Sequence, residues 1–434
     1  INNKVMKKQF LLLILSTLFA MPLVAQEFNL SGELRPRYEN RYGFASLRSD
    51  GDAAGNFISQ RTRINFDFKN SKMVFKVILQ NVRVWGDVST LASNDKSIAF
   101  HEAWAEGIIS DKLRLKIGRQ EIAYDDQRIF GSSGWAQQAR SHDALLLKIT
   151  PNTNHKLDLG IAYNADNQSN IDNLYSNIAG YKAFQYAWYH GDFKRFGLSF
   201  LFLNNGIQYI NNEGLPSENI KVDYSQTIGP RTTYKSDNFS IDAAFYLQTG
   251  KSYNKSIDSN YFGGNFNYVF SPSFNVTIGG EHFSGRDMDE SSNDIKSFKP
   301  LFGSNHKFNG LMDYFYVGNH ANNVGLNDIY LHLGFSKNNW SAKLSPHYLA
   351  SSAKIINNEN NQNLDNYLGT EIDLMIGYKI NNIKIDAGYS QMFATESMET
   401  IKGGNSKLSN NWAWIMITFK PNFLNYKFNI PEKK

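Results

Sequence analysis

Apolar and polar residues alternate along most of this chain with the two-residue period of a β-strand. Between Phe28 and Phe419, stretches of about ten such residues come in pairs that share a very short turn, and longer polar segments separate the pairs. Segment 368–379 shows the alternation clearly, with Ile372, Leu374 and Ile376 set against Glu371 and Asp373. Because side chains alternate across a strand, each stretch has one apolar face and one polar face.

This pattern predicts an all-β protein, a transmembrane antiparallel up-and-down β-barrel of about 18 strands. The first strand is expected near Phe28–Tyr42 and the last at Asn411–Phe419, so both ends lie on one side of the membrane. We assign that side to the periplasm, and the longer loops to the outside. Short periplasmic turns are expected near Asn70-Ser71, Asp111, Pro151 to Asn154, Phe193-Lys194, Ser236-Asp237, Ser271 to Ser273, Asn338 and Asn381.

The longest predicted loop, residues 286–327, is unusually aromatic for a solvated loop. We expect it either to fold into the lumen as a constriction or to cap the mouth of the barrel. The alternative is that part of it extends a strand above the membrane. Its aromatic residues are Phe298, Phe302, Phe308, Tyr314, Phe315 and Tyr316.

The composition excludes several other classes of protein. The mean hydropathy is −0.44, and beyond the N-terminus there is no apolar run of the roughly 18 residues that a membrane-spanning helix needs. The chain has no cysteine, so a disulfide framework and a lipidated N-terminal cysteine are both excluded. A net charge of +5 does not indicate a nucleic-acid-binding protein.

The N-terminus has the features of a secretory signal peptide. Lys7 and Lys8 precede an apolar segment at residues 10–20, and Ala25 offers a small residue before a cleavage site. We predict a signal peptide at residues 1–25, with residues 1–5 as an upstream extension. Residues 26–434 would then form the barrel, ending in a short periplasmic tail after Phe419.

Charged residues predict the lining of the lumen, because a charged side chain facing lipid costs roughly 2–4 kcal/mol for Arg or Lys at the midplane. The first two strands carry a basic ladder interleaved with acids, which would concentrate anions in the pore. In the alternative, the Arg and Glu side chains pair with each other, so that the lumen is an unselective pore. The predicted lumen residues are Glu33, Arg35, Arg37, Arg61, Arg63, Asp67, Glu102, Arg119, Arg128, Arg140 and Asp143.

The sequence supports a metal site or a catalytic site less well than it supports a channel. Asp287, Asp289 and Asp294 crowd one outer loop and could bind calcium, but a solvated acidic loop is the better interpretation, so no cofactor is predicted. No histidine spacing indicates zinc. Ser141 and His142, the local candidates for catalysis, are neighbours that point to opposite faces of a strand, so we predict no enzyme.

Several motifs resemble the alginate-export family of outer-membrane porins. They span most of the barrel and include Gly32 to Arg41, Gly118-Arg119-Gln120-Glu121 with Tyr124, Asp126, Arg128, Gly131, Trp135, Arg140, Ser141 and Asp143, Gly279 to Phe283, Asn305 to Phe308, and Met312 to Phe315. The resemblance implies a monomeric barrel with an arginine-rich constriction that passes an anionic polysaccharide. Its pore arginines would correspond to Arg35, Arg37, Arg61, Arg63, Arg119, Arg128 and Arg140. One departure is Asp125, at a position where the family pattern has glycine.

The sequence therefore predicts an outer-membrane channel of a Gram-negative bacterium, which passes an anionic polysaccharide or a related organic anion. A general diffusion or uptake porin and a surface adhesin are the alternatives. On the channel hypothesis, neutralising Arg35, Arg37, Arg61 and Arg63 lowers anion conductance and reverses selectivity. The partners expected are outer-membrane lipid and lipopolysaccharide, an anionic saccharide and periplasmic export components, and no nucleic acid.

Overall fold

The computed structural model describes residues 26–92, 98–171, 174–175, 180–211, 219–315, 324–357 and 359–428. The predicted signal peptide and the last six residues of the predicted tail lie outside these ranges, as does Tyr316 of the long loop. Among the described residues, no helix is both long and apolar enough to cross a membrane.

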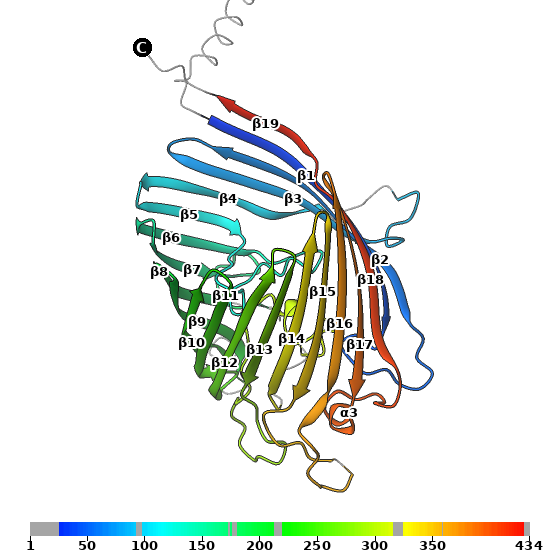
Figure 1. The fold of residues 1–434 in the computed structure, drawn as a ribbon. Helices are drawn as coiled ribbons and strands as arrows, with labels where there is room; N and C mark the ends of the chain where they lie inside the picture. The colour runs from blue at the N-terminus through cyan, green and yellow to red at the C-terminus, as the bar shows by residue number, and fades with distance from the viewer. Residues whose placement is uncertain are drawn as a thin grey trace, which may run out of the picture.

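Antiparallel strands pair in sequence order and close into a barrel, which confirms the predicted fold (Figure 1). The strands are β1 (Gln26–Tyr42), β2 (Gly55–Lys69), β3 (Met73–Val84), β4 (Ile98–Ser110), β5 (Leu113–Gln120), β6 (His142–Asn152), β7 (His155–Tyr163), β8 (Ala183–Phe193), β9 (Phe196–Ile210), β10 (Ile220–Lys235), β11 (Phe239–Ser252), β12 (Lys255–Ser271), β13 (Phe274–Phe283), β14 (Leu326–Lys337), β15 (Trp340–Ala350), β16 (Tyr367–Ile380), β17 (Ile383–Ala394), β18 (Asn410–Phe419) and β19 (Asn422–Phe428). A short helix, α3 (Glu396–Lys402), follows β17.

The barrel has 18 strand positions because β18 and β19 succeed each other along one edge of β1. β18 pairs with residues 34–42 of β1 and β19 with residues 26–31, while β2 pairs with the opposite edge. Figure 1 shows β19 beside β1 at the end of the barrel opposite α3. Residues 422–428, which belong to the predicted periplasmic tail, therefore continue the last strand after Pro421 and pair with β1.

The predicted short turns are all found between the expected strands. One further connection differs from the prediction of a longer loop. It is the two-residue turn Tyr253-Asn254 between β11 and β12, in which both residues have positive φ angles of 52° and 59°. Such a turn matches the twist of two long paired strands, so these strands continue without a loop between them.

The two faces of the wall follow the alternation in the sequence. In β16, the outward Ile372, Leu374 and Ile376 are 36–43% exposed, whereas the inward Glu371 and Asp373 are at most 1% exposed. This reversal of the usual burial pattern is what a barrel in lipid requires, because apolar side chains face the membrane and polar ones face the lumen.

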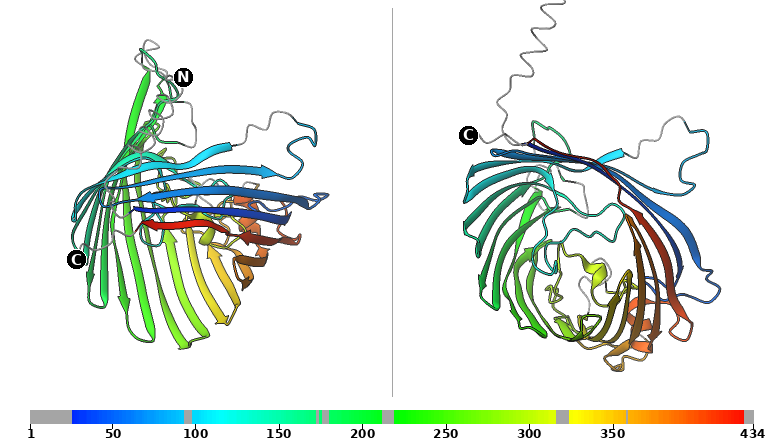
Figure 2. Two further views of the ribbon diagram at one scale, coloured as in Figure 1. Left: turned by 90° about the horizontal axis from the view of Figure 1, so that it is seen from above. Right: turned by 45° about the horizontal axis from the view of Figure 1, so that its top comes forward.

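The lumen is not empty. Figure 2 (right) shows two chain segments inside the ring of strands, one from residues 121–141 and one from the connection between β13 and β14. The described part of the second segment, residues 284–315, contains no strand, so the sequence alternative of a strand extended above the membrane is wrong there. We call residues 121–141 the first inward loop and residues 284–315 the second inward loop.

Trp412 on β18 links the wall to this interior. Its side chain is completely buried, its Nε1 donates to Glu39 Oε2 at 3.1 Å, and its ring lies 5.6 Å from that of Trp135 in the first inward loop. Three residues along the same strand, Ile415 faces outward and is 45% exposed.

We expect Trp412→Ala to lower the free energy of unfolding by about 3–5 kcal/mol, since it removes a large buried ring and leaves a cavity. Denaturant titration in detergent micelles, followed by tryptophan fluorescence and by electrophoretic mobility, measures the loss. Ile415→Ala is the matched control on the same strand and should cost clearly less. Equal losses for the two variants would contradict the inward packing of Trp412.

Candidate functional site: two loops that constrict the lumen

The two inward loops are joined to each other by backbone hydrogen bonds. The amide of Gly131 donates to Phe302 O at 2.8 Å, that of Phe302 to Ile129 O at 3.0 Å, and that of Ser304 to Gln127 O at 2.9 Å. Arg140 adds a bond from Nη1 to Gly303 O at 2.9 Å. The loops therefore form one constriction across the lumen, in which neither is a separate flexible arm.

Aromatic side chains pack this constriction against one side of the wall. Phe130 of the first loop lies 5.4 Å from Phe302 of the second and 5.8 and 4.8 Å from Phe184 and Tyr186 of β8, between ring centroids. All but Phe302 are at most 3% exposed. Burial of such rings stabilises the position of both loops.

On the opposite side of the lumen, arginines of β1 and β2 bind the backbone of the first inward loop. Arg35 donates to Gly134 O at 2.8 Å and through two nitrogens to Gln137 Oε1 at 2.9 and 3.1 Å. Arg37 donates to Trp135 O at 2.8 Å and lies over its ring at 4.0 Å. We call Arg35, Arg37 and Arg61 the arginine clamp.

Arg61 completes the clamp from β2. It forms an ion pair with Glu33 at 2.6 Å and directs Nη1 toward Gln137 O at 3.4 Å. A buried guanidinium must satisfy several donors at once, and loop carbonyls do so here. These three arginines of the predicted basic ladder thus hold the loop in place and are themselves buried.

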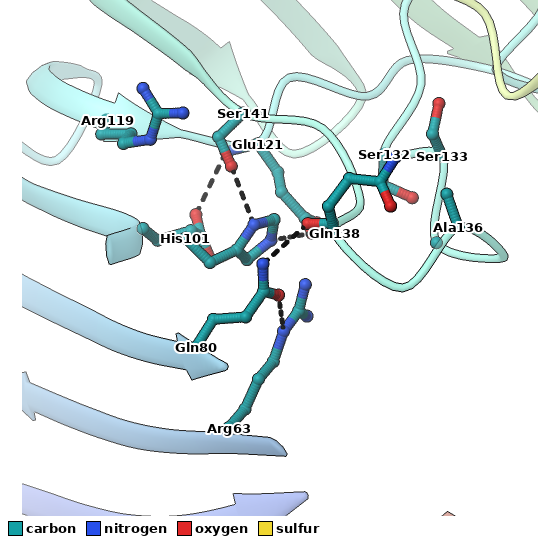
Figure 3. Close-up of polar contacts among 12 residues, drawn as sticks. Arg63, Gln80, His101, Arg119, Glu121, Ser132, Ser133, Ala136, Gln138 and Ser141 are labelled. Carbon is teal, nitrogen blue, oxygen red and sulfur yellow. Dashed lines mark hydrogen bonds and ion pairs between the residues drawn. The ribbon is translucent and has the colours of Figure 1, made fainter. Parts of the chain in front are cut away.

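A second set of contacts holds the two ends of the first inward loop together (Figure 3). His101 of β4 binds Ser141 Oγ through Nδ1 at 3.2 Å and Glu121 Oε1 through Nε2 at 2.8 Å. Glu121 and Ser141 are the first and last residues of the loop, so His101 closes its neck. The sequence placed Ser141 beside His142, whereas its histidine partner comes from 40 residues upstream.

Figure 3 also shows how Gln80 of β3 extends the clamp. Arg63 Nε donates to Gln80 Oε1 at 2.7 Å, and Gln80 Nε2 donates to Gln138 O at 3.0 Å. Arg63 is therefore linked to the loop through the side chain of Gln80.

The second inward loop is held by carboxylates of the wall. Its turn at Gly310 has φ of 85°, and a Cβ there would lie 2.5 Å from the Glu371 carboxylate. The amide of Met312 donates to Glu371 Oε1 at 2.7 Å, and that of Leu311 to Asp373 Oδ2 at 3.2 Å. Glycine is required at this turn because both the backbone angle and the close approach exclude a side chain.

Arg128 and Glu281 form a buried ion pair below the contact of the two loops. Asn309 donates to Glu281 Oε2 at 2.6 Å and to Asp328 Oδ2 at 3.1 Å, and Arg128 stacks on the ring of Phe308 at 3.5 Å. The pair is nearly inaccessible, so Arg128 is a structural link between the first loop, the second loop and β13. It is not a residue that a passing solute would meet.

Beyond Gly310, the described end of the second loop is tied to the helix α3. Lys402 donates to Tyr314 O, and the Tyr314 hydroxyl donates to Gly43 O. Burial lowers the pKa of Lys402 to about 8. These bonds hold residues 312–315 against β1 and α3 at the loop end of the barrel.

Two cavities lie on either side of the constriction. The loop-side chamber has a volume of about 660 Å³ and is lined by side chains that include Arg37, Arg41, Arg83, Trp135, His306 and Lys307. The turn-side chamber has a volume of about 230 Å³ and is lined by residues that include Asp126, Arg231, Asp242, Glu281, Lys307 and His347. Gln127 lines the first chamber and its neighbour Asp126 the second, so the first inward loop runs between them.

Two of the predicted lumen residues are on the wrong face. Arg119 and Asp143 are directly opposite each other on β5 and β6 and form an ion pair at 2.8 Å, with 44% and 60% of their side chains exposed. They share the outward face with Ile117 and Leu145, two positions away on the same strands. They belong to the outer surface of the barrel near the loop end, where a charged pair avoids the membrane midplane.

The other predicted residues lie inside the barrel, and the structure shows the partners of most. Glu102 binds Lys76 at 3.1 Å, and Asp67 is on the same face of β2 as Arg61 and Arg63. Sequence reasoning missed Lys307 and His101. Lys307 belongs to the Asn305 to Phe308 motif, which was noted for resemblance and not for charge.

The predicted calcium residues make protein contacts. Asp287 Oδ1 accepts from the Lys354 amide at 2.8 Å, and Asp289 pairs with Lys354 Nζ at 2.7 Å, a hydrogen bond that lowers the pKa of the Asp289 carboxyl. Within the part of the chain that the structure describes, no group of three or more acidic or histidine residues could hold a metal ion.

A closed barrel of 18 strand positions, with an apolar outer face and loops folded into a polar lumen, defines an outer-membrane channel of the porin class. The model of the alginate export family matches residues 26–410, and the chain belongs to that family. No protein in the curated set matches the chain.

Solved structures of the same fold include channels of two bacteria. OccAB4 of Acinetobacter baumannii superposes with a TM-score of 0.61 at 12% identity, covering 92% of this chain and 98% of that one. OpdO of Pseudomonas aeruginosa gives 0.59 at 12% identity, with 92% and 98% covered. OpdK of Pseudomonas aeruginosa, whose structure is with vanillate, gives 0.57 at 12% identity, with 93% and 99% covered.

The arginine clamp predicts that replacing one of its arginines loosens the first inward loop, whereas arginines exposed in the lumen would mainly affect anion selectivity. We expect Arg35→Met to release the first inward loop, because hydrogen bonds to a charged group contribute about 1.5–3 kcal/mol each and Arg35 makes several to this loop. Single-channel recordings in planar bilayers should show a larger and noisier conductance than the wild type. Trypsin should also cut the loop faster, at Arg128 or Arg140.

Arg114→Met is the matched control. Arg114 also lies on the wall and pairs with Glu106 at 3.2 Å, but it contacts neither inward loop. Its replacement should leave conductance and cleavage unchanged. A quiet, wild-type conductance in correctly folded Arg35→Met would show that the clamp does not hold the loop.

Proposed function

We propose that this outer-membrane channel passes small organic anions, from acids with a single ring to short anionic saccharides. The observation that carries the proposal is the loop-side chamber, where cationic side chains and an aromatic surface face one cavity. A volume of about 660 Å³ is in the range of small-molecule sites. The constriction beneath it favours small solutes over a bulky polymer.

The lining of the loop-side chamber supports a carboxylated solute with a ring. Arg41 has 37% of its side chain exposed and lines the chamber, where it also pairs with Glu39 at 2.9 Å. Trp135 and His306 give the same chamber an aromatic lining, with the Trp135 ring in contact with Arg37 at 4.0 Å and with His306 at 4.5 Å. Guanidinium groups bind carboxylates and aromatic edges pack against other rings, so the two features together suit an aromatic acid or a uronate.

The relatives are consistent with such a solute. The structure of OpdK is with vanillate, an aromatic carboxylate, and the family is described by alginate export, which concerns an anionic polysaccharide. Both ligands carry carboxylates on rings. We place the termini and the short turns in the periplasm, the long loops outside, and outer-membrane lipid and lipopolysaccharide against the apolar outer face, while periplasmic export components would be needed only for a polymer.

The test is the reversal potential of the refolded channel in planar bilayers under a potassium chloride gradient, followed by addition of glucuronate, vanillate and oligomers of uronate. We expect a preference for chloride over potassium and a reduction of current by the monomeric acids. Current block by long oligomers alone would favour polymer export. A channel without ion preference or block would make general diffusion the function, and absence of conductance would favour an adhesin.

A further inference from the structure

Lys307 stands at the point where the two chambers meet. It closes the 3-10 helix Asn305–Lys307 of the second inward loop, whose ends are fixed by bonds from the Lys307 amide to Ser304 O at 3.3 Å and from the Phe308 amide to Asn305 O at 3.0 Å. Among the described residues, it is the one that lines both the loop-side and the turn-side chamber. Lys307 is therefore within reach of a solute in either chamber.

The other cations near this point are engaged by protein groups. Arg37 and Arg41 bind Glu39, and Arg83 donates to Asn81 Oδ1 at 2.9 Å. Arg231 binds Asp242 and lies within 4.0 Å of Asp125 and Asp126. Lys307 has the ring of Phe308 at 4.8 Å from Nζ, and within the described part of the chain it forms no ion pair. Its ammonium group remains available to a passing anion.

The balance of charge in both chambers depends on this residue. The loop-side chamber is lined by four cations and three carboxylates, and the turn-side chamber by two cations and three carboxylates, with Lys307 counted in each. Without it, the first chamber has no net charge and the second has −2. A glutamate at the same position would make both chambers negative.

We propose that Lys307 is the residue that sets the charge selectivity of the channel, by binding the carboxylate of the solute as it crosses from one chamber to the other. The assignment rests on the proposed function and names the residue responsible for it. Pores select ions through charged side chains at their narrowest part, where low-dielectric walls strengthen the field. The arginine clamp does not fill this role because its donors are occupied by the loop backbone.

The experiment compares reversal potentials under a potassium chloride gradient for the wild type, Lys307→Glu, Lys307→Gln and Lys307→Arg. We expect Lys307→Glu to reverse the preference from chloride to potassium, Lys307→Gln to weaken it, and Lys307→Arg to preserve it. Block by glucuronate should fall in the glutamine variant and return in the arginine variant. Electrophoretic mobility without heating confirms that each variant is a folded barrel.

Lys354→Glu is the matched control. Lys354 carries the same charge, but it lies in the connection after β15 and pairs with Asp289 outside both chambers. It should leave the reversal potential unchanged. If Lys307→Glu stays as selective for chloride as the wild type, or if Lys354→Glu shifts the potential equally, Lys307 does not set selectivity.

The outcomes separate this inference from the proposed function. A chloride-selective wild type with an unaltered Lys307→Glu variant overturns the assignment of Lys307 and leaves the proposed function standing. A wild type without ion preference whose Lys307→Glu variant prefers potassium overturns the proposed function and supports the assignment.

Discussion

Hydrogen bonds between charged side chains of the wall and the backbone of the two inward loops determine the interior of this channel. The wall must be polar inside because its other face is in lipid, and a strand presents that polarity at every second residue. Arg35, Arg37 and Arg61 use it to bind carbonyls of one loop, and Glu371 and Asp373 use it to bind amides of the other. Basic residues thus hold acceptors and acidic residues hold donors, on two different parts of the ring.

In this arrangement, the arginines of the clamp support the first inward loop and are not themselves exposed to a solute. A guanidinium group that is buried against loop carbonyls contributes to the shape of the passage, and its charge is compensated locally by Glu33 or Glu39. The charge that a solute can meet then belongs to the fewer groups at the chamber surfaces. The shape of the passage and the charge at the chamber surfaces therefore depend on different residues, which can be altered separately.

Much of the wall could be predicted from the sequence. Lipid on one side of the wall requires an apolar residue at every second position, and this alternation runs along the strands. Strand order, the turns and the inward face of Glu371 and Asp373 all follow from it. Arg119 was misplaced because its charge was given more weight than the alternation of its own strand, in which Lys116 points inward and position 119 must point outward. Residues 422–428 were missed because Pro421 interrupts the pattern before the pairing with β1 resumes.

The interior could not be predicted in the same way, because its contacts join residues that are far apart in the sequence and have no common period. Arg35 meets Gln137 across 102 positions, and Arg128 meets Glu281 across 153. The motifs that resemble the alginate export family nevertheless meet here, since residues 124–140 and 305–315 belong to the two inward loops and residues 32–41 and 279–283 contact these loops. These motifs are therefore among the residues that build the constricted lumen of this chain. The proposed selectivity depends on the few side chains that this geometry leaves facing the chambers, and Lys307 is one of them.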